Sequence, residues 1–459
     1  MNSPQSPQPA TLKVLLALAW PIIISRSSQV VVGVCDAVMV AHLGKAALAA
    51  TTTGAFNTFA LLILPMGVVF IVSSYSAQLF GKGDLVGARR YGYYGLLVAL
   101  LAQGLSLAGV ALAPWALAQL GYAEDVRRLM TGYFFWRMLS GGAAIGIEAL
   151  GNYYGGLGRT RLPMIANVGA MVLNVALNWV LINGNLGAPA MGVSGAALAS
   201  TISTSTAFCG LLAWFLYEGK LLGAVLPRLH ASEFFRMLRF GIPSGLNWFF
   251  EFFAFNFFIN VVVVGLGTSA LAAMMAVLQI NSVSFMPAFG VSSAGAILVG
   301  QSIGAGNKER VGGIVWLTFK TNAAWQGLVG LAYLAAPAVL FAPFLSKEAD
   351  AHLMLEVGAR MLMLSAAWQL FDAAVSTVAE ALRAAGDTAF TLWARLIISW
   401  AIFVPGSYVT VRVLGHSDVA AMGWVVGYLA ILAVVLTIRF RGGAWRKLEL
   451  VDPTAAPAH

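Results

Sequence analysis

The sequence predicts an all-α membrane protein whose twelve transmembrane helices form two parallel six-helix repeats. Composition is the first reason: 59% of the 459 residues are hydrophobic and 10% are charged, whereas a soluble protein carries about 25% charged residues. Internal duplication is the second reason. The third is a series of apolar segments long enough to cross a bilayer. The mean hydropathy of +0.83 agrees with this class.

The duplication is visible in short matching blocks. Leu43–Ala50 reads LGKAALAA and Leu266–Ala273 reads LGTSALAA, so the second copy follows 223 residues later (266 − 43). Gln78–Asp84 (QLFGKGD) matches Gln301–Asn307 (QSIGAGN) in the same way. Duplication in so hydrophobic a chain is typical of transporters built from two related halves. Because six helices is an even number, both halves start on the same side and the repeats are parallel.

Apolar segments of spanning length divide the chain. We expect a tail at 1–13, an N-lobe at 14–217, a loop at 218–237, a C-lobe at 238–440 and a second tail at 441–459. The N-lobe segments are 14–41, 48–75, 91–115, 129–153, 163–185 and 192–217. The C-lobe segments are 238–264, 270–298, 313–341, 354–381, 390–413 and 419–440. The residues after Lys447 are polar and are predicted to be disordered.

Lys and Arg residues predict the orientation. They are concentrated in the tails and in the loops that follow even-numbered segments, for example at Arg159, Arg161 and Lys308. The positive-inside rule therefore places both termini of this multi-pass protein in the cytoplasm. We expect the membrane to be a bacterial inner membrane. The basic residues form no long run, so the net charge of +9 does not indicate nucleic acid as a partner. Cys35 and Cys209 lie in apolar segments and provide neither a disulfide framework nor zinc spacing.

Three acids inside apolar segments are the candidate cation- and substrate-binding residues: Asp36, Glu251 and Asp372. An ionisable side chain at membrane depth costs about 2.5–3.5 kcal/mol on insertion scales and usually has a function. The alternative is that each acid is protonated and only bonds a neighbouring helix. We expect Glu251 and Asp372 to approach each other across two helices and to share Na⁺ or H⁺, with Asp36 as a second site.

Polar residues at helical spacing supply candidate cavity-lining positions. They are Gln29, seven residues before Asp36; Asn174 and Asn178, four apart; Asn247, four before Glu251; Trp368, four before Asp372; and, more weakly, Gln279. Asn174 and Asn178 could equally hold helices together. Helix 238–264 is rich in Phe and could stack on aromatic cations, although a core or lipid-facing role is commoner for such a helix.

Other charged residues receive structural interpretations. Glu148 and Glu380 lie near the predicted cytoplasmic ends of their segments, and Glu380 is expected to form a surface pair with Arg383 three residues away. Arg26 is ten residues from Asp36, on a different helix face, so we expect it to extend toward the interface. Arg26→Ala should then preserve folding. A pairing of Arg26 with an acid on another helix is the less favoured alternative.

Several blocks together resemble the multidrug and toxic compound extrusion (MATE) transporters over about residues 14–440. They are VCDAVMVAHLG, QLFGKGD, GLGRTRLPM, NVALNWVLI, MGVSGAALAS and GVSSAGAILVGQSIGAGN, and Pro21 precedes them. The acids Asp36, Glu251 and Asp372 resemble the set of the NorM-type branch. The resemblance implies export of small, mostly cationic organic compounds in exchange for Na⁺ or H⁺, without a cofactor, by a protein we expect to be a monomer. Arg26 departs from the pattern.

The sequence gives less support to other functions. A major-facilitator carrier would have a basic residue where Leu85 stands in GKGDLVGARR, and a flippase for a lipid-linked precursor should present buried cations to a pyrophosphate. An enzyme is not indicated, since the sequence contains no HExxH, GxSxG or GxxxxGK[ST] motif.

Overall fold

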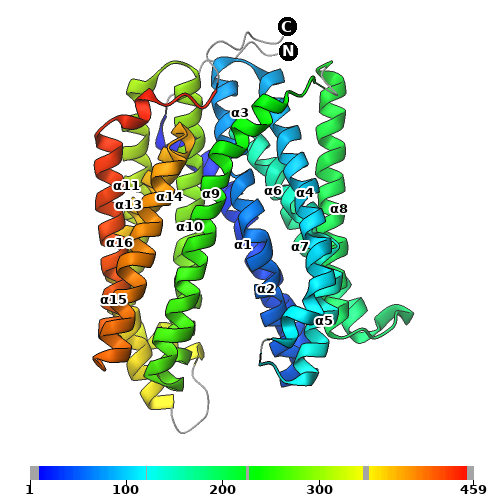
Figure 1. The fold of residues 1–459 in the computed structure, drawn as a ribbon, viewed down its shortest axis with the longest axis vertical. Coiled ribbons are helices and arrows are strands. Elements are labelled where there is room, and N and C mark those ends of the chain that lie inside the picture. Colours follow the sequence, from blue (N-terminus) through cyan, green and yellow to red (C-terminus); the bar gives the residue numbers. More distant parts are fainter. Residues whose placement is uncertain (1–9, 120, 224–226, 345–350, 452–459) are drawn as a thin grey trace. The chain divides into compact units, whose positions relative to one another are not determined.

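The computed structural model describes residues 10–119, 121–223, 227–344 and 351–451. In these ranges the regular structure is helical, which confirms the predicted all-α class (Figure 1). The predicted tails 1–13 and 441–459 lie partly outside the described residues. Contacts divide the chain into two compact units. We call residues 21–245 the N unit, and Leu246–Asp452 together with the residues up to Trp20 the C unit.

The described residues of the first half of the chain form eight α-helices. They are α1 (Leu12–Ala41), α2 (Lys45–Val69), α3 (Ile71–Lys82), α4 (Leu85–Ala118), α5 (Glu124–Met138), α6 (Gly141–Gly156), α7 (Arg161–Asn183) and α8 (Val193–Leu221). Within the N unit, α4 packs on α6, α7 on α8, and α2 on α5.

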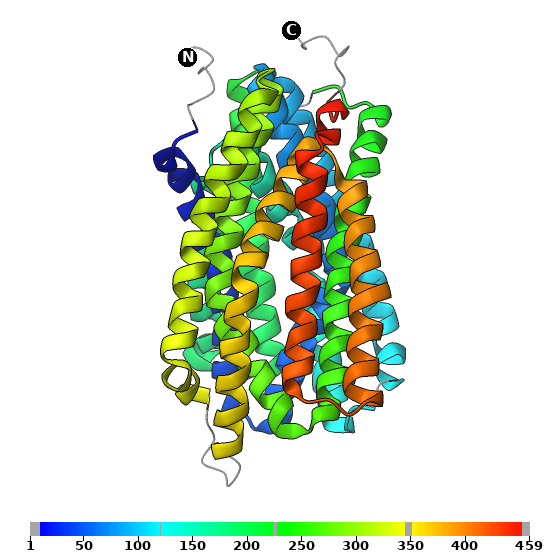
Figure 2. The ribbon, with the colours of Figure 1, turned by 90° about the vertical axis from the view of Figure 1, so that its left-hand side faces the viewer.

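In the second half, the part that the structure describes forms another eight. They are α9 (Ala231–Phe257), α10 (Thr268–Gly304), α11 (Val311–Ala335), α12 (Pro337–Phe341), α13 (Ala351–Ala385), α14 (Thr388–Ile397), α15 (Val404–Tyr408) and α16 (Asp418–Arg441). In the C unit, α13 packs against α10, α11 and α16, and Figure 2 shows these long helices running alongside one another. Helices α8 and α9 extend into the predicted loop 218–237 from both ends.

Helix lengths account for most of the predicted spans. Within the described residues, ten helical stretches are long and apolar enough to cross a membrane, with α2 and α3 (Lys45–Lys82) and α14 and α15 (Thr388–Val413) each counted as one stretch. The number is eleven if α11 and α12, which meet at a 95° bend, form one span. The remaining predicted segment, 129–153, is divided between α5 and α6 at Leu139 and Ser140, and each helix is too short to span alone.

Local sequence explains where several helices begin and end. Gly83 ends α3 in the left-handed conformation (φ 84°), which glycine adopts without a Cβ penalty. One residue later, the Asp84 carboxylate accepts a 2.7 Å hydrogen bond from the Gly87 backbone N–H and caps α4. The matching motif QLFGKGD is therefore a helix stop followed by a helix start.

Two glycines allow two N-unit helices to touch. A Cβ on Gly67 of α2 would lie 2.6 Å from the Cα of Gly245 in α9, and a Cβ on Gly245 would lie 2.5 Å from the Leu64 carbonyl oxygen. No larger residue fits here without displacing backbone, as is common where membrane helices pack closely.

Candidate functional site

Asp36 lies in a buried polar cluster of the N unit, built from α1, α7 and α8. Its Oδ1 accepts a 2.6 Å hydrogen bond from Asn178 Nδ2, and its Oδ2 accepts a 3.0 Å bond from Ser200 Oγ. Asn174 Nδ2 donates to Ser200 Oγ at 2.9 Å, and its Oδ1 accepts from Asn178 Nδ2 at 3.2 Å. Asp36 is 5% exposed and both asparagines are completely buried. The structure thus joins the predicted acid to the predicted asparagine pair.

The partners of Asp36 are neutral. Within the described residues, its hydrogen-bond donors are an amide and a hydroxyl. Arg137 of α5 acts on Asp36 only through longer-range electrostatics, while its guanidinium donates to Ser140 Oγ at 3.1 Å. Asn178 Oδ1 is buried and accepts no hydrogen bond in the described part of the chain. A carboxylate beside an unused amide oxygen can receive a proton or a small cation without breaking an ion pair.

Arg26 and Gln29 form a second N-unit cluster, which corrects two predictions. Arg26 makes a bidentate ion pair with Glu148 of α6, at 2.7 and 2.8 Å, so it does not simply extend toward the interface. Gln29 donates to Glu148 Oε1 at 3.1 Å and to Asn167 Oδ1 at 3.4 Å rather than joining Asp36. Spacing along α1 correctly separated Arg26 from Asp36, but it says nothing about acids on other helices. Gln29 shares a face with Asp36 but is about 10 Å away along the axis, so it meets different neighbours.

Glu251 of α9 forms an ion pair with Arg395 of α14 in the C unit. The Arg395 side chain is 9% exposed and that of Glu251 is 25% exposed. The Tyr428 side chain is buried beside the pair. Both α9 and α14 continue into π-helical turns, at Phe258–Val262 and Ile398–Phe403, and such turns are frequent at functional sites.

Asp372 of α13 has a neutral donor of its own. Gln326 Nε2 of α11 donates to Asp372 Oδ2 at 2.8 Å. Asp372 is close enough to Glu251 and Arg395 to interact with them electrostatically. Gln326 Oε1 is buried and accepts no hydrogen bond among the described residues. Asn322 Oδ1, one turn away on α11, is also buried and accepts no hydrogen bond among these residues. Asp372 therefore repeats the arrangement of Asp36: a carboxylate, an amide donor and an unused amide oxygen.

The remaining predicted positions separate into buried and exposed groups. Asn247 is half-buried and its Oδ1 has no hydrogen-bond partner in the described ranges, whereas Trp368 is buried. Gln279 is exposed on α10. Its neighbour Asn281 instead accepts a 2.6 Å hydrogen bond from Gln369. The expected Glu380–Arg383 pair is present, but both residues are 8% exposed, so it is a buried pair and not a surface pair.

The Phe-rich helix α9 packs partly into the core of the C unit. The Phe255 ring lies 5.9 Å from Phe403 and 6.1 Å from Tyr428, between centroids. Phe258 packs 5.0 Å from Phe403. These contacts favour the core interpretation for this end of the helix, next to the Glu251–Arg395 pair.

The repeat gives equivalent positions different chemistry. Pro21 of the first half aligns with Pro243 of the second half. Gln29 follows Pro21 by eight residues, as Glu251 follows Pro243 (29 − 21 = 251 − 243). Gly158 likewise aligns with Gly386, each being followed two residues later by a threonine. Asn167 follows Gly158 by nine residues, as Arg395 follows Gly386 (167 − 158 = 395 − 386). The amide pair Gln29–Asn167 in the N unit therefore corresponds in sequence to the ion pair Glu251–Arg395 in the C unit.

Sequence reasoning missed several partners. Arg395 is a basic residue inside the predicted segment 390–413, so the rule that identified the acids also applies to it. Asn322 and Gln326 have the same four-residue spacing as Asn174 and Asn178. Ser200 gives no comparable signal, because serine is common in membrane helices.

Comparisons with known proteins agree with this architecture. The family model MatE matches residues 21–180 and 243–409. The probable multidrug resistance protein NorM of Mesorhizobium japonicum is 29% identical, covering 98% of this chain and 96% of that protein. The multidrug resistance protein PmpM of Pseudomonas aeruginosa is 29% identical, covering 89% and 87%.

Solved structures share the fold. A MATE protein in complex with MaD5 has a TM-score of 0.85 at 19% identity, covering 98% of this chain and all of the other (100%). A multidrug resistance MATE family transporter of the MOP superfamily, in an outward-facing conformation, has a TM-score of 0.82 at 19% identity, with 95% and 97% coverage. These likenesses confirm the predicted fold class.

Proposed function

Because the chain belongs to the MATE family of multi-pass membrane transporters, and is thus not an enzyme, we propose that it exports small organic cations in exchange for Na⁺ or H⁺. The curated relatives named above are called multidrug resistance proteins. We further propose a bacterial inner membrane, cytoplasmic termini and a monomer that works by rocking of its two halves. The finer assignment rests on the three intramembrane acids.

The observation that carries the proposal is the pairing of a carboxylate with a half-used amide in each unit. Asn178 donates to Asp36 and Gln326 donates to Asp372, and both amide oxygens are buried without a partner among the described residues. Buried polar atoms are normally hydrogen-bonded, so an unpaired one calls for an explanation such as a water or an ion. Carboxylate and amide oxygens are suitable ligands for a hard cation such as Na⁺, and the carboxylate alone can take H⁺.

We propose for Glu251 a different role from the one that the sequence suggested. Arg395 already neutralises it, so binding Na⁺ there requires breaking an ion pair, whereas binding at Asp372 does not. The net charge of this cluster is −1 when Asp372 is ionised, because it contains two acids, Glu251 and Asp372, and one base, Arg395. We therefore propose Asp372 as the C-unit site of the coupling ion, with Gln326 and Asn322 supplying amide oxygens, and Asp36 as the N-unit site.

Exchange follows from competition for this charge. With Asp372 ionised, the C-unit cluster attracts an organic cation. When Na⁺ or H⁺ occupies Asp372, the net charge of the cluster falls to zero and the attraction is lost. Coupling to transport then requires only that the two ligands favour different conformations.

A flippase for a lipid-linked precursor remains the second candidate class, but nothing in the clusters favours it. Arg26 and Arg395 are each engaged by a glutamate, and Arg137, which acts on Asp36 at longer range, donates to the Ser140 hydroxyl. A pyrophosphate would need cations that are not already neutralised.

The test uses purified protein in vesicles, with ethidium efflux measured under an imposed Na⁺ gradient at equal pH and, separately, under a pH gradient in potassium buffer. Asp36→Asn and Asp372→Asn should each reduce gradient-driven efflux strongly while the protein still folds. Glu309→Gln is the matched control, because the Glu309 side chain is 86% exposed. Coupling equal to wild type in both asparagine variants contradicts the site assignment, and absence of gradient-driven efflux from the wild type contradicts the function.

A further inference from the structure

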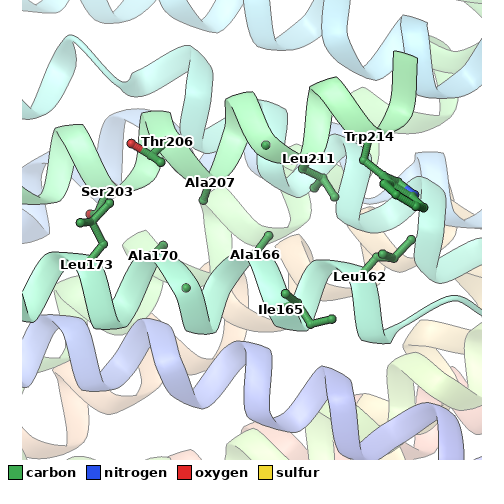
Figure 3. A pocket seen from close by; sticks show the side chains of 12 residues that line it. Leu162, Ile165, Ala166, Ala170, Leu173, Ser203, Thr206, Ala207, Leu211 and Trp214 are labelled. Carbon is green, nitrogen blue, oxygen red and sulfur yellow. The ribbon is translucent and has the colours of Figure 1, made fainter. Parts of the chain in front are cut away.

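An elongated apolar groove runs along the surface of the N unit between α7 and α8. One end of it, at Leu173 and Ser203, borders the Asp36 cluster, since Ser203 Oγ donates to the Ser200 carbonyl oxygen at 3.1 Å. The volume of the groove is about 370 Å³, and Figure 3 shows the side chains that line it. Small residues such as Ala166, Gly169 and Gly210 contribute to its lining. Ile165 and Trp214, which also line it, are 62% and 47% exposed, so the groove opens outward.

The groove has the length of one membrane leaflet. Its lining extends on α7 from Leu162 to Leu173, eleven residues or about 16 Å of helix. The hydrocarbon core of a bilayer is about 30 Å thick, so the groove covers roughly half of it. A transmembrane helix from a second copy would need a contact surface along the whole thickness of the bilayer. A lipid acyl chain occupies one leaflet and matches the observed length.

One end of the groove carries positive charge. Arg161 is the first residue of α7 and directly precedes the lining residue Leu162, and Lys220 lies in the last turn of α8, beyond the lining residue Trp214. Arg159 lies nearby in sequence and pairs with Glu218. Basic side chains therefore outnumber the acidic Glu218 in this part of α7 and α8.

Aromatic residues mark the same end as a membrane interface. Trp214 and Tyr217 are 47% and 54% exposed, and their ring centroids are 5.9 Å apart. Trp and Tyr are enriched where membrane helices meet the headgroup region. The groove therefore starts at headgroup level, under a basic rim, and ends near the middle of the bilayer.

We propose that this groove is a binding site for an anionic glycerophospholipid. One acyl chain lies along α7 and α8 from Trp214 toward Leu173, and the phosphate lies at Arg161 and Lys220. The charge complementarity selects an anionic over a zwitterionic headgroup, and the apolar lining supplies affinity that does not depend on the headgroup. Lipid retention can be measured without transport, so the proposal can be tested independently of the proposed export function.

The experiment places the purified chain in nanodiscs of phosphatidylglycerol and phosphatidylcholine at equal amounts and measures retained lipid by native mass spectrometry. Gly169→Leu and Gly210→Leu should fill the groove without a clash, because a Cβ at either position meets no atom within 4 Å. The matched control is Gly104→Leu, an exposed position on α4 of the same unit with equally open surroundings.

Wild type and Gly104→Leu should retain phosphatidylglycerol, and the groove-filling variants should retain at least about fivefold less, corresponding to roughly 1 kcal/mol. Arg161→Gln with Lys220→Gln should abolish the preference for phosphatidylglycerol over phosphatidylcholine. Undiminished retention in both filling variants overturns the proposal. So does a loss of dimer mass on filling, which would make the groove an interface between copies.

A second measurement uses wild-type protein and does not depend on how the variants fold. Phosphatidylglycerol with a photoactivatable group in its acyl chain should crosslink to peptides covering 162–173 and 203–214. Crosslinks distributed over other apolar surfaces, without enrichment here, contradict the proposed site.

Discussion

The Arg26–Glu148 ion pair should stabilise the N unit measurably, contrary to what the spacing of Arg26 along α1 suggests. The Glu148 side chain is 8% exposed and that of Arg26 is 19% exposed, and two hydrogen bonds of 2.7 and 2.8 Å join them. Removing one partner of a buried pair costs about 3–5 kcal/mol, because the other charge stays buried and uncompensated. Since Arg26 is partly exposed, we expect Arg26→Gln to cost about 3 kcal/mol, the lower end of that range.

A double-mutant cycle separates the pair from its surroundings. The variant with both Arg26→Gln and Glu148→Gln replaces two charges by two amides that can bond each other, so it should be more stable than Arg26→Gln alone. The expected coupling energy is about 2 kcal/mol, from unfolding of the purified protein by SDS in mixed micelles. Arg446 and Glu309 provide a control cycle, because their side chains are 48% and 86% exposed and 3.4 Å apart. Their coupling should stay below about 1 kcal/mol.

Equal coupling in the two cycles would refute the reasoning, because it would mean that burial adds nothing to the Arg26–Glu148 pair. A double variant less stable than the sum of the single variants would refute it more strongly. Retained stability in Arg26→Gln would restore the interpretation drawn from the sequence, in which Arg26 has no partner on another helix.

Three further outcomes follow from the structure. Arg395→Gln should destabilise the protein about as much as Arg26→Gln, and adding Glu251→Gln in the same chain should restore part of the lost stability. SDS unfolding measures both effects, and an absence of rescue contradicts the pairing. Gly67→Ala should lower the free energy of unfolding by about 1–3 kcal/mol, because its Cβ would lie 2.6 Å from the Gly245 Cα. Unchanged unfolding would mean that α2 and α9 can separate freely. A cysteine at Glu309, in an otherwise cysteine-free chain, should resist a membrane-impermeant thiol reagent added outside intact cells, whereas efficient labelling would reverse the predicted topology.

Much of the fold could be predicted because apolar length and helical termini are local properties. The predicted segments 14–41, 163–185 and 419–440 differ from α1, α7 and α16 by at most two residues at either end. The division of segment 129–153 into α5 and α6 was missed, since hydrophobicity continues across Leu139 and Ser140 while the helix does not. Hydrophobicity reports the environment of a segment and not the continuity of its hydrogen bonds.

The sequence identified Asp36, Glu251 and Asp372 as candidate site residues, and their role stays a prediction, but it identified their partners only in part. Asn174 and Asn178 were grouped correctly, because four-residue spacing puts them on one face of α7. Their contact with Asp36 could not be derived, since periodicity identifies a face but not the helix that it meets. The same limit explains why Arg395 and Glu148 were not recognised as partners of Glu251 and Arg26.

The two halves of the duplicated chain distribute charge differently at equivalent positions, and this difference bears on how one protein could handle two cations. In the C unit the duplicated positions hold Glu251 and Arg395, and in the N unit they hold Gln29 and Asn167. Ion pairs resist the loss of either charge, whereas a carboxylate held by neutral donors can change its charge without leaving a partner uncompensated. Asp36 and Asp372 are of the second kind in their respective units. The ion pairs would therefore fix helices in position, and the two aspartates would be the groups whose occupancy changes during transport.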